Sequence, residues 1–425
     1  MSPGNGSAAT PELARPSNTL VLTWGVALRS LRASVAVASL LAVTGPASAQ
    51  SPFAPATGPY PVGTLRLLMV DSARAELSSA DREVPRRLIV QVWYPAAPQV
   101  GTLRAPYVPE FRELAQDLGE GYPTLALDTL QASAWWDAPP LSARRFPLVV
   151  FSHGMNSARY FYTGLLQDLA SHGFIVAAID HPFWSLAAAF GDRGRLSLAE
   201  SMVSRDQLTS DEIDGFMQDG VALMAEDQAF VASRLPAAAP RLHPAIDHRR
   251  IGVMGHSMGG MAATLSCWRY RLFSACASLD GLVWAREGLS PVGEPPNRVA
   301  KPFLLLLSSQ FLPRDLSTAV RRYRRAWRDP SLCLVPGTRH NSVTDLPQLR
   351  GTAPNPGDLD AAVAASVIRG SVAGFFGVVL AGRPAPPALA DSTIRRLPGD
   401  TVPATRSFAQ LPAYGCLAFT SPRLD

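Results

Sequence analysis

The sequence predicts an α/β protein with a mostly parallel sheet of eight strands and helices on both faces of the sheet. Short apolar runs alternate along the chain with segments of helical periodicity, and the last six runs are apolar almost throughout. Strands that are buried on both faces of a parallel sheet have this continuous apolar character. The expected strands are residues 64–70, 88–93, 148–152, 175–180, 251–254, 275–279, 303–308 and 332–335.

The first two of these runs alternate between apolar and polar residues, which favours an antiparallel edge of the sheet. Alternating strands and helices imply right-handed crossovers between parallel neighbours. The expected helices are residues 159–171, 211–235, 258–270, 316–327 and 358–380.

Composition excludes several functional classes. With 425 residues and 47% hydrophobic content, the chain can bury a full-sized core. The net charge of +5 comes from scattered arginines, Lys301 being the one lysine, and no aromatic-and-basic stripe accompanies them. We therefore expect no nucleic-acid partner. The scattered arginines would allow transient contact with an anionic lipid surface, and the alternative interpretation is a solvated basic face. The sequence leaves the oligomeric state unknown.

The N-terminal segment predicts a secretory signal peptide over residues 1–49. Arg29 and Arg32 precede an apolar run at 33–43, and small residues lead to a cleavage site after Ala49. An uncleaved anchor is the alternative, although the run is short for a membrane span. The protein is thus expected to be exported, either to a periplasm or out of the cell.

Beyond the signal, one catalytic domain is expected over residues 50–382, with a peripheral C-terminal tail at 383–425. Residues of about 102–145 and 182–210 carry aromatics and prolines without a strand pattern, and we interpret them as insertions. In open α/β sheets such insertions surround the carboxyl ends of the strands, where ligands bind.

Four cysteines, an even number, suit an oxidising compartment. Three pairings are possible, and the sequence does not choose between them. No two have the C-x-x-C spacing of a zinc site, so we expect no metal. The four are Cys267, Cys276, Cys333 and Cys416.

The segment Gly255-His-Ser257-Met-Gly259-Gly predicts a nucleophilic serine. It has the pattern G-x-S-x-G between an expected strand and an expected helix, which is the context of the nucleophile elbow in the α/β-hydrolase fold. The tight turn strains the serine backbone and leaves no room for side chains at Gly255 and Gly259. Ser257 is therefore the expected nucleophile.

A serine hydroxyl needs a base to take its proton. Of the seven histidines, His340 follows the last expected strand, where this fold places its base. His181, which also follows a strand, is the main competitor. His256 is adjacent to the nucleophile, and we expect it to point away and to serve packing.

The acid that orients the base has two candidates. Asp280 directly follows the strand at 275–279, and Asp315 lies in the segment after 303–308. Both satisfy the chain order Ser, Asp, His. The sequence context favours Asp280, because Asp315 has a more exposed setting, and leaves both open.

The oxyanion hole needs two backbone N–H groups. One is expected from Met258, which follows the nucleophile, and the other from Met155 in the turn after the strand at 148–152. Trp135 and Trp136 are candidates for the wall of an apolar substrate pocket, with core packing as an equal alternative.

Three motifs together carry a family resemblance: Phe146-Pro-Leu-Val-Val-Phe-Ser-His-Gly154, the segment DLASHGFIVAAID at 168–180, and Gly255-His-Ser-Met-Gly-Gly260. The chain resembles the plasma and type II platelet-activating-factor acetylhydrolases over roughly residues 57–380. The resemblance implies a calcium-independent serine esterase without cofactor, with Asp280 as acid, His340 as base and the Met155 and Met258 amides as oxyanion hole. The chain departs from the family in having leucine two residues after Asp280 and in having Met258 where phenylalanine is usual.

We therefore expect a hydrolase of short-chain carboxylic esters, including phospholipids with short sn-2 chains, that acts through an acyl-enzyme. A secreted cutinase-like or lipase-like esterase of polyesters or triglycerides is the alternative enzyme. A catalytically silent hydrolase fold that only binds ligands is the alternative from another class.

Overall fold

The computed structural model describes residues 53–76, 83–121, 125–191, 194–197, 209–283, 292–295, 297–310, 313–328, 330–349, 357–384 and 417–418. They belong to one compact unit, Ser48–Asp425. The expected signal peptide at 1–49 lies outside the described residues, and so does the expected tail apart from 383–384 and 417–418.

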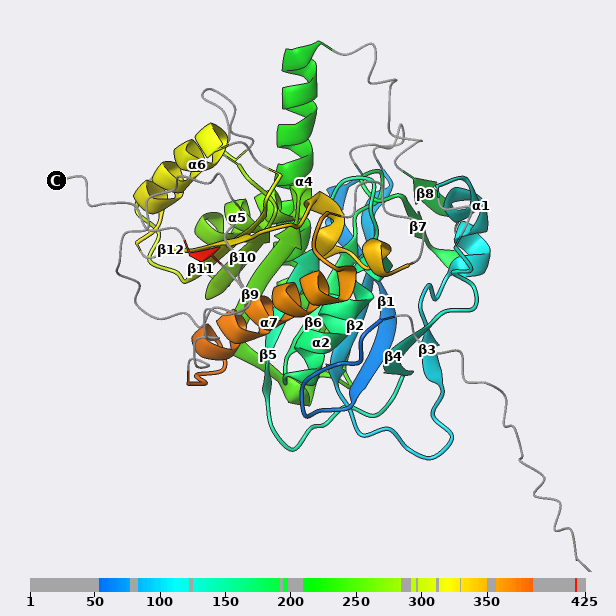
Figure 1. Cartoon of the computed structure of the whole chain (residues 1–425). Coiled ribbons are helices and arrows are strands. Elements are labelled where there is room, and N and C mark those ends of the chain that lie inside the picture. Colours follow the sequence, from blue (N-terminus) through cyan, green and yellow to red (C-terminus); the bar gives the residue numbers. More distant parts are fainter. Residues whose placement is uncertain are drawn as a thin grey trace, which may run out of the picture. The chain divides into compact units, whose positions relative to one another are not determined.

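A sheet of eleven strands within the described residues organises this unit (Figure 1). Its strand order is β13-β12-β11-β10-β9-β5-β6-β2-β1-β4-β3. Neighbours from β6 to β12 pair in parallel, whereas β2 pairs antiparallel with both β1 and β6. The strands are β1 Val62–Ala75, β2 Pro85–Pro95, β3 Arg104–Pro106, β4 Gln131–Trp136, β5 Phe146–Ser152, β6 Ile175–Asp180, β9 Ile246–His256, β10 Ala275–Leu279, β11 Phe303–Ser308, β12 Pro330–Val335 and β13 Leu417–Ala418.

The mostly parallel α/β fold and its antiparallel first pair are confirmed, whereas the count of eight strands is too low. The eight expected strands are present, and short strands extend both edges, namely β3 and β4 on one side and β13 on the other. β3 and β13 have three and two residues, which is too short for a periodic pattern to show in the sequence. The insertions also contain more regular structure than expected. The first contains α1 Phe111–Gly121 in addition to β3 and β4, and the second contains a separate two-stranded sheet, β7 Ala187–Ala189 and β8 Arg195–Ser197.

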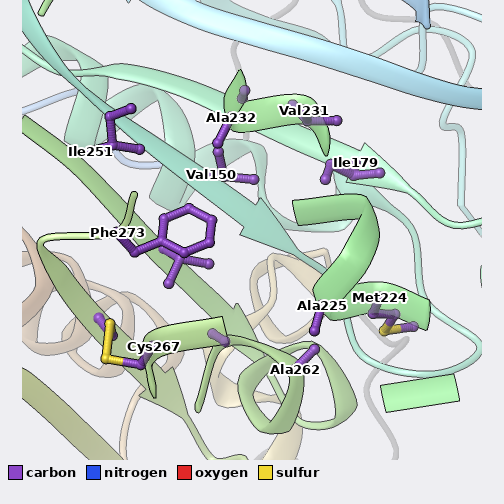
Figure 2. Packing of buried hydrophobic residues seen from close by; sticks show 14 of the residues in the cluster. Val150, Ile179, Met224, Ala225, Val231, Ala232, Ile251, Ala262, Cys267 and Phe273 are labelled. Carbon is purple, nitrogen blue, oxygen red and sulfur yellow. A yellow bond between two sulfur atoms is a disulfide. The ribbon is translucent and has the colours of Figure 1, made fainter. Parts of the chain in front are cut away.

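Helices pack on both faces of the sheet because its strands present apolar side chains in both directions. Val150 and Leu305 join the core cluster with α4, α5 and α6, whereas Val149 and Leu304 join the cluster with α2 and α7. Figure 2 shows part of the first cluster, where Met224 and Ala225 of α4 lie near Ala262 of α5. The helices are α1 Phe111–Gly121, α2 Thr163–Ser171, α4 Ser210–Ala238, α5 Met258–Arg269, α6 Pro313–Ala326 and α7 Ala361–Val379, with 3-10 turns η1 Arg159–Tyr162, η4 His243–Ala245, η5 His340–Val343 and η6 Leu346–Gln348.

Local sequence explains where the helices begin. Thr209 caps α4 in a capping box with Glu212, and Asp360 caps α7 by accepting from the amides of Ala362 and Val363. Among the described helices, α7 alone is long and apolar enough to cross a membrane by length and composition. Half of that stretch is buried, and α7 packs against α2 (Figure 1), as the core helix of a globular domain does.

Candidate active site

The fold gathers the three residues of the predicted catalytic set at the edge formed by the carboxyl ends of the parallel strands. Ser257 follows β9, Asp280 follows the adjacent strand β10, and His340 begins η5 after β12. The strands β5, β9, β10, β11 and β12 are parallel, so all their carboxyl ends meet at this edge. Side chains up to 83 residues apart in sequence are thereby brought to neighbouring turns.

Ser257 occupies a sharp turn between β9 and α5. Its backbone has φ 53° and ψ −121°, a region that non-glycine residues adopt only under strain of about 1–3 kcal/mol. A Cβ on Gly255 would lie 2.2 Å from the carbonyl oxygen of Gly259, and a Cβ on Gly259 would lie 2.2 Å from that of Ser152. Both glycines are therefore required, and Ser257 itself is half-buried at the start of α5.

Asp280 and His340 form a hydrogen-bonded pair. Oδ2 of Asp280 lies 2.7 Å from Nδ1 of His340. The carboxylate also accepts from the amide and hydroxyl of Ser308, at 2.6 and 2.9 Å, and from Nε2 of Gln310 at 3.2 Å. Because the carboxylate is fully buried and the imidazole is not, the acid is fixed and holds the base from behind.

The other acid candidate, Asp315, falls within α6, and its side chain lies outside the described residues. In the described part of the chain, Asp280 is the acidic residue within salt-bridge distance of His340.

The predicted hydrogen bond between the nucleophile and the base is not formed in this structure. Among the hydrogen bonds of the described residues, none joins the Ser257 hydroxyl to His340. Hydrogen bonds of this kind are often long or poorly aligned in a ligand-free site and tighten when substrate binds.

The loop after β5 lies against the nucleophile. A Cβ on Gly154 would lie 3.1 Å from Cβ of Ser257, so only a glycine lets the loop approach this closely without displacing it. Met155 follows in the same loop, and Met258 is the first residue of α5, whose N–H has no partner within the helix. The two residues predicted for the oxyanion hole thus flank Ser257.

His181, the competing base, belongs to a second Ser–His–Asp arrangement. Its Nε2 lies 2.9 Å from Oγ of Ser152 and its Nδ1 lies 2.9 Å from Oδ2 of Asp227. All three side chains are fully buried, and Asp227 also pairs with Arg86. Burial lowers the pKa of His181, and hydrogen bonding to Asp227 opposes this shift. Since no substrate can reach these groups, the arrangement is structural.

Trp135 and Trp136 do not lie near the nucleophile. Both are on β4, five strand positions from β9, which corresponds to about 24 Å. Trp135 pairs with Gly63 at the start of β1, at the opposite end of the sheet from Ser257. The structure therefore separates these two rings from the site.

Apolar residues nearer the nucleophile come from the segment between β6 and β7 and from α4. A Cβ on Gly220 would lie 2.3 Å from Cε of Met258 and 2.4 Å from the ring of Trp184, so this helix packs closely on both. The rings of Trp184 and Phe216 are 4.2 Å apart. The sequence reasoning missed this apolar cluster, and the signal for it was the aromatic pair Phe183-Trp184 that follows β6.

Among the described residues, one group could by position hold a metal ion: His256, Asp280 and His340 each offer a ligand atom within 4.8 Å of the others. Hydrogen bonds already engage these side chains, as described for Asp280 and His340 and below for His256. We interpret the group as a hydrogen-bonded set.

Residues 46–197 match the model of the family "Platelet-activating factor acetylhydrolase, isoform II". A platelet-activating factor acetylhydrolase of Cavia porcellus is 23% identical over 239 residues, which cover 52% of this chain and 53% of that protein. A probable 1-alkyl-2-acetylglycerophosphocholine esterase of Arthroderma benhamiae is 24% identical over 320 residues, covering 69% and 76%.

Over residues 46–197 the chain is similar to this acetylhydrolase family, and the curated relatives that it matches carry the same activity in their names. It spans about half the length of the mammalian relatives that it matches. Its fold is similar to that of a ferulic acid esterase from Streptomyces cinnamoneus, with a TM-score of 0.65 and 30% identity over 79% of this chain and 95% of that one. The family and the esterase neighbour both support a carboxylic ester hydrolase.

Proposed function

We propose that this chain is a member of the acetylhydrolase family and a serine carboxylic-ester hydrolase, with Ser257 as nucleophile, His340 as base and Asp280 as the acid that orients it. The observation that carries the proposal is the pair of Asp280 and His340 beside a strained, half-buried serine. A buried carboxylate on Nδ1 holds the other ring nitrogen available for the proton of Ser257 and stabilises the imidazolium.

In the proposed reaction, Oγ of Ser257 attacks the ester carbonyl and its proton passes to His340. The oxyanion accepts from the amides of Met155 and Met258, and each such donor is worth about 2.7–4 kcal/mol in the transition state. The alcohol leaves with the proton from His340. Water, deprotonated by the same imidazole, then attacks the acyl-enzyme, and the acid is released as Ser257 regains its proton.

The preferred substrates are esters of short acyl groups, including the sn-2 esters of phospholipids, as the names of the relatives suggest. The apolar cluster of Trp184, Phe216 and Met258 next to the nucleophile supports an acyl site that excludes water. Export is part of the proposal, because the N-terminal pattern is that of a signal peptide and a disulfide joins Cys267 to Cys276.

A second substrate class follows from the solved neighbour. Its name is that of an esterase of an aromatic acid, and the rings of Trp184 and Phe216 contact each other at a tilt beside Met258 in this chain. An aromatic acyl group would fit against such rings.

An ester panel separates these classes. Turnover is measured for p-nitrophenyl esters from acetate to palmitate, for phosphatidylcholines of matched sn-2 chain length, for methyl ferulate and for a polyester film. We expect the highest kcat/KM with the shortest acyl groups, and no turnover by Ser257→Ala. An optimum at long chains or on the film would contradict the acetylhydrolase-like substrate class, and no turnover of any ester by the wild type would favour a binding protein.

A further inference from the structure

A continuous chain of hydrogen bonds joins the loop after β5 to the loop of the proposed base. The amide of Gly154 donates to Oη of Tyr162 at 3.1 Å, and Oη lies 2.8 Å from Nδ1 of His256. On the far side of the same ring, Nε2 of His256 lies 2.9 Å from the carbonyl oxygen of His340. Tyr162 belongs to η1, His256 ends β9 and His340 begins η5, so the link joins three elements to the loop after β5.

For a neutral His256 ring, the two backbone ends fix the direction of every hydrogen bond in this chain. The Gly154 amide is only a donor and the His340 carbonyl is only an acceptor. The Tyr162 hydroxyl therefore accepts from Gly154 and donates to Nδ1, and the remaining ring proton of His256 lies on Nε2 and donates to His340. A neutral His256 ring is thus held in one tautomer.

Burial and neighbouring charge both favour the neutral form of the His256 ring. His256 is 2% exposed and Tyr162 is fully buried. Burial lowers the pKa of His256 well below its usual value and the nearby imidazoles of His340 and His153 lower it further, whereas the hydrogen bond to the His340 carbonyl opposes this shift. The ring of His256 lies with its centroid 4.5 Å from that of His340. A charge on His256 would therefore oppose the imidazolium that His340 must become during the proposed reaction.

We propose that His256, oriented by Tyr162, is a positioning residue for this reaction: it anchors the His340 carbonyl and so sets the imidazole against Ser257. This inference rests on the proposed function. Through Tyr162 the same link also holds Gly154, the residue before the proposed oxyanion donor Met155. The sequence analysis assigned His256 a packing role; the two hydrogen bonds at opposite ends of its ring give it a further one.

Three substitutions at His256 separate positioning from packing. His256→Phe keeps a ring and removes both hydrogen bonds. His256→Gln keeps an N–H donor near the position of Nε2, and His256→Asn keeps an acceptor near Nδ1 but has no donor that reaches His340. Tyr162→Phe tests the link from the other side, and His243→Phe, at an exposed histidine, is the matched control.

The readouts are kcat and KM on p-nitrophenyl acetate, the rate of Ser257 labelling by a fluorophosphonate, and the midpoint of thermal unfolding. We expect His256→Phe and His256→Asn to lower kcat and the labelling rate by about 10- to 100-fold with KM little changed, because small displacements of a reacting group have effects of this size. His256→Gln should recover most of the rate, Tyr162→Phe should lower it, and the control should match the wild type.

Wild-type rates in His256→Phe, or equal losses in His256→Phe and His256→Gln, would overturn the inference while leaving the proposed function in place. If His256→Phe does not fold, the same reading applies to Tyr162→Phe and to His256→Gln against His256→Asn. A wild-type protein that is not labelled at Ser257 would instead overturn the proposed function, and the inference with it.

Discussion

Nδ1 of His340 lies 2.7 Å from Oδ2 of Asp280, although 60 residues separate the two along the chain. The side chain of Asp280 is fully buried, whereas that of His340 is 37% exposed. One partner is held inside the protein by Ser308 and Gln310, and the other reaches the surface where a substrate arrives. A base that is oriented from one side and reacts on the other needs this arrangement.

Asp280→Asn is expected to lower kcat on p-nitrophenyl acetate by about 10,000-fold at pH 7, because the amide neither holds the required tautomer of His340 nor stabilises its charged form. Circular dichroism checks that the variant is folded. Asp137→Asn, at a half-exposed surface ion pair with Arg241, is the matched control and should keep its activity. An Asp280→Asn variant with a tenth of wild-type kcat would contradict this role.

Gly154→Ala tests how closely the loop after β5 must approach the nucleophile. The added Cβ would lie 3.1 Å from Cβ of Ser257 and 3.2 Å from Nδ1 of His256, so the loop must shift. We expect kcat to fall by about 10-fold or more, since small misplacements near reacting groups are costly. Gly215→Ala in α4 meets no atom within 4 Å and should leave kcat unchanged. Equal kcat in the two variants would show that the approach is not needed.

A buried acid close to the base loop predicts a pH dependence of stability. Burial raises the pKa of Asp345 from 3.8 to about 7, while Arg369 and hydrogen bonds from Gly164 and Tyr107 oppose the shift. Between these pH values the folded protein retains a proton that the unfolded chain releases. The free energy of unfolding is therefore highest below about pH 4 as far as this group is concerned, and its contribution is lost as the pH rises through about 7.

Urea unfolding between pH 4 and pH 8 measures this effect. The contribution of Asp345 should have a slope of up to about 1.4 kcal/mol per pH unit, and Asp345→Asn should remove it. The Oδ1 of asparagine keeps an acceptor for the Gly164 amide or the Tyr107 hydroxyl. If the two proteins showed the same pH slope, Asp345 would not titrate in this range.

The disulfide between Cys267 and Cys276 joins the end of α5 to the start of β10. These two elements lead from Ser257 and into Asp280. Closing a loop with a sequence separation of 9 stabilises the folded state by about 2–3 kcal/mol through chain entropy. We expect the double variant Cys267→Ala/Cys276→Ala to lose at least this much in the free energy of unfolding and to keep kcat at 25 °C. A lost kcat in a protein of unchanged stability would make the bond part of the site instead.

Much of this fold was predictable because its central strands are buried on both faces. Composition alone predicts strands in the runs that form β5, β6, β9, β10, β11 and β12. The motif around Ser257 predicts the sharp turn in which this residue lies. The edges were not predictable in this way. β13 consists of Leu417–Ala418 and exists through its pairing with Cys333 and Leu334 of β12, which no local pattern reveals.

The residues of the site fall into the same two groups, those that the sequence predicts and those that it does not. Ser257, Asp280 and His340 each follow a recognisable strand, so topology alone predicts that they lie at one edge. Ser308 and Gln310 act through hydrogen bonds to Asp280, which lies 28 and 30 residues away, and Tyr162 acts through His256, which lies 94 residues away; nothing local marks these residues. Trp135 and Trp136 illustrate the opposite error: aromatic content alone suggested a pocket wall, but the strand order places them far from Ser257.

Labelling by a fluorophosphonate tests the central claim most directly. The reagent needs an activated serine, and peptide mapping by mass spectrometry locates the adduct. The account predicts one adduct, on Ser257, that forms rapidly in the wild type and is almost absent in His340→Ala. An adduct on another serine, or equal labelling with and without His340, would contradict it.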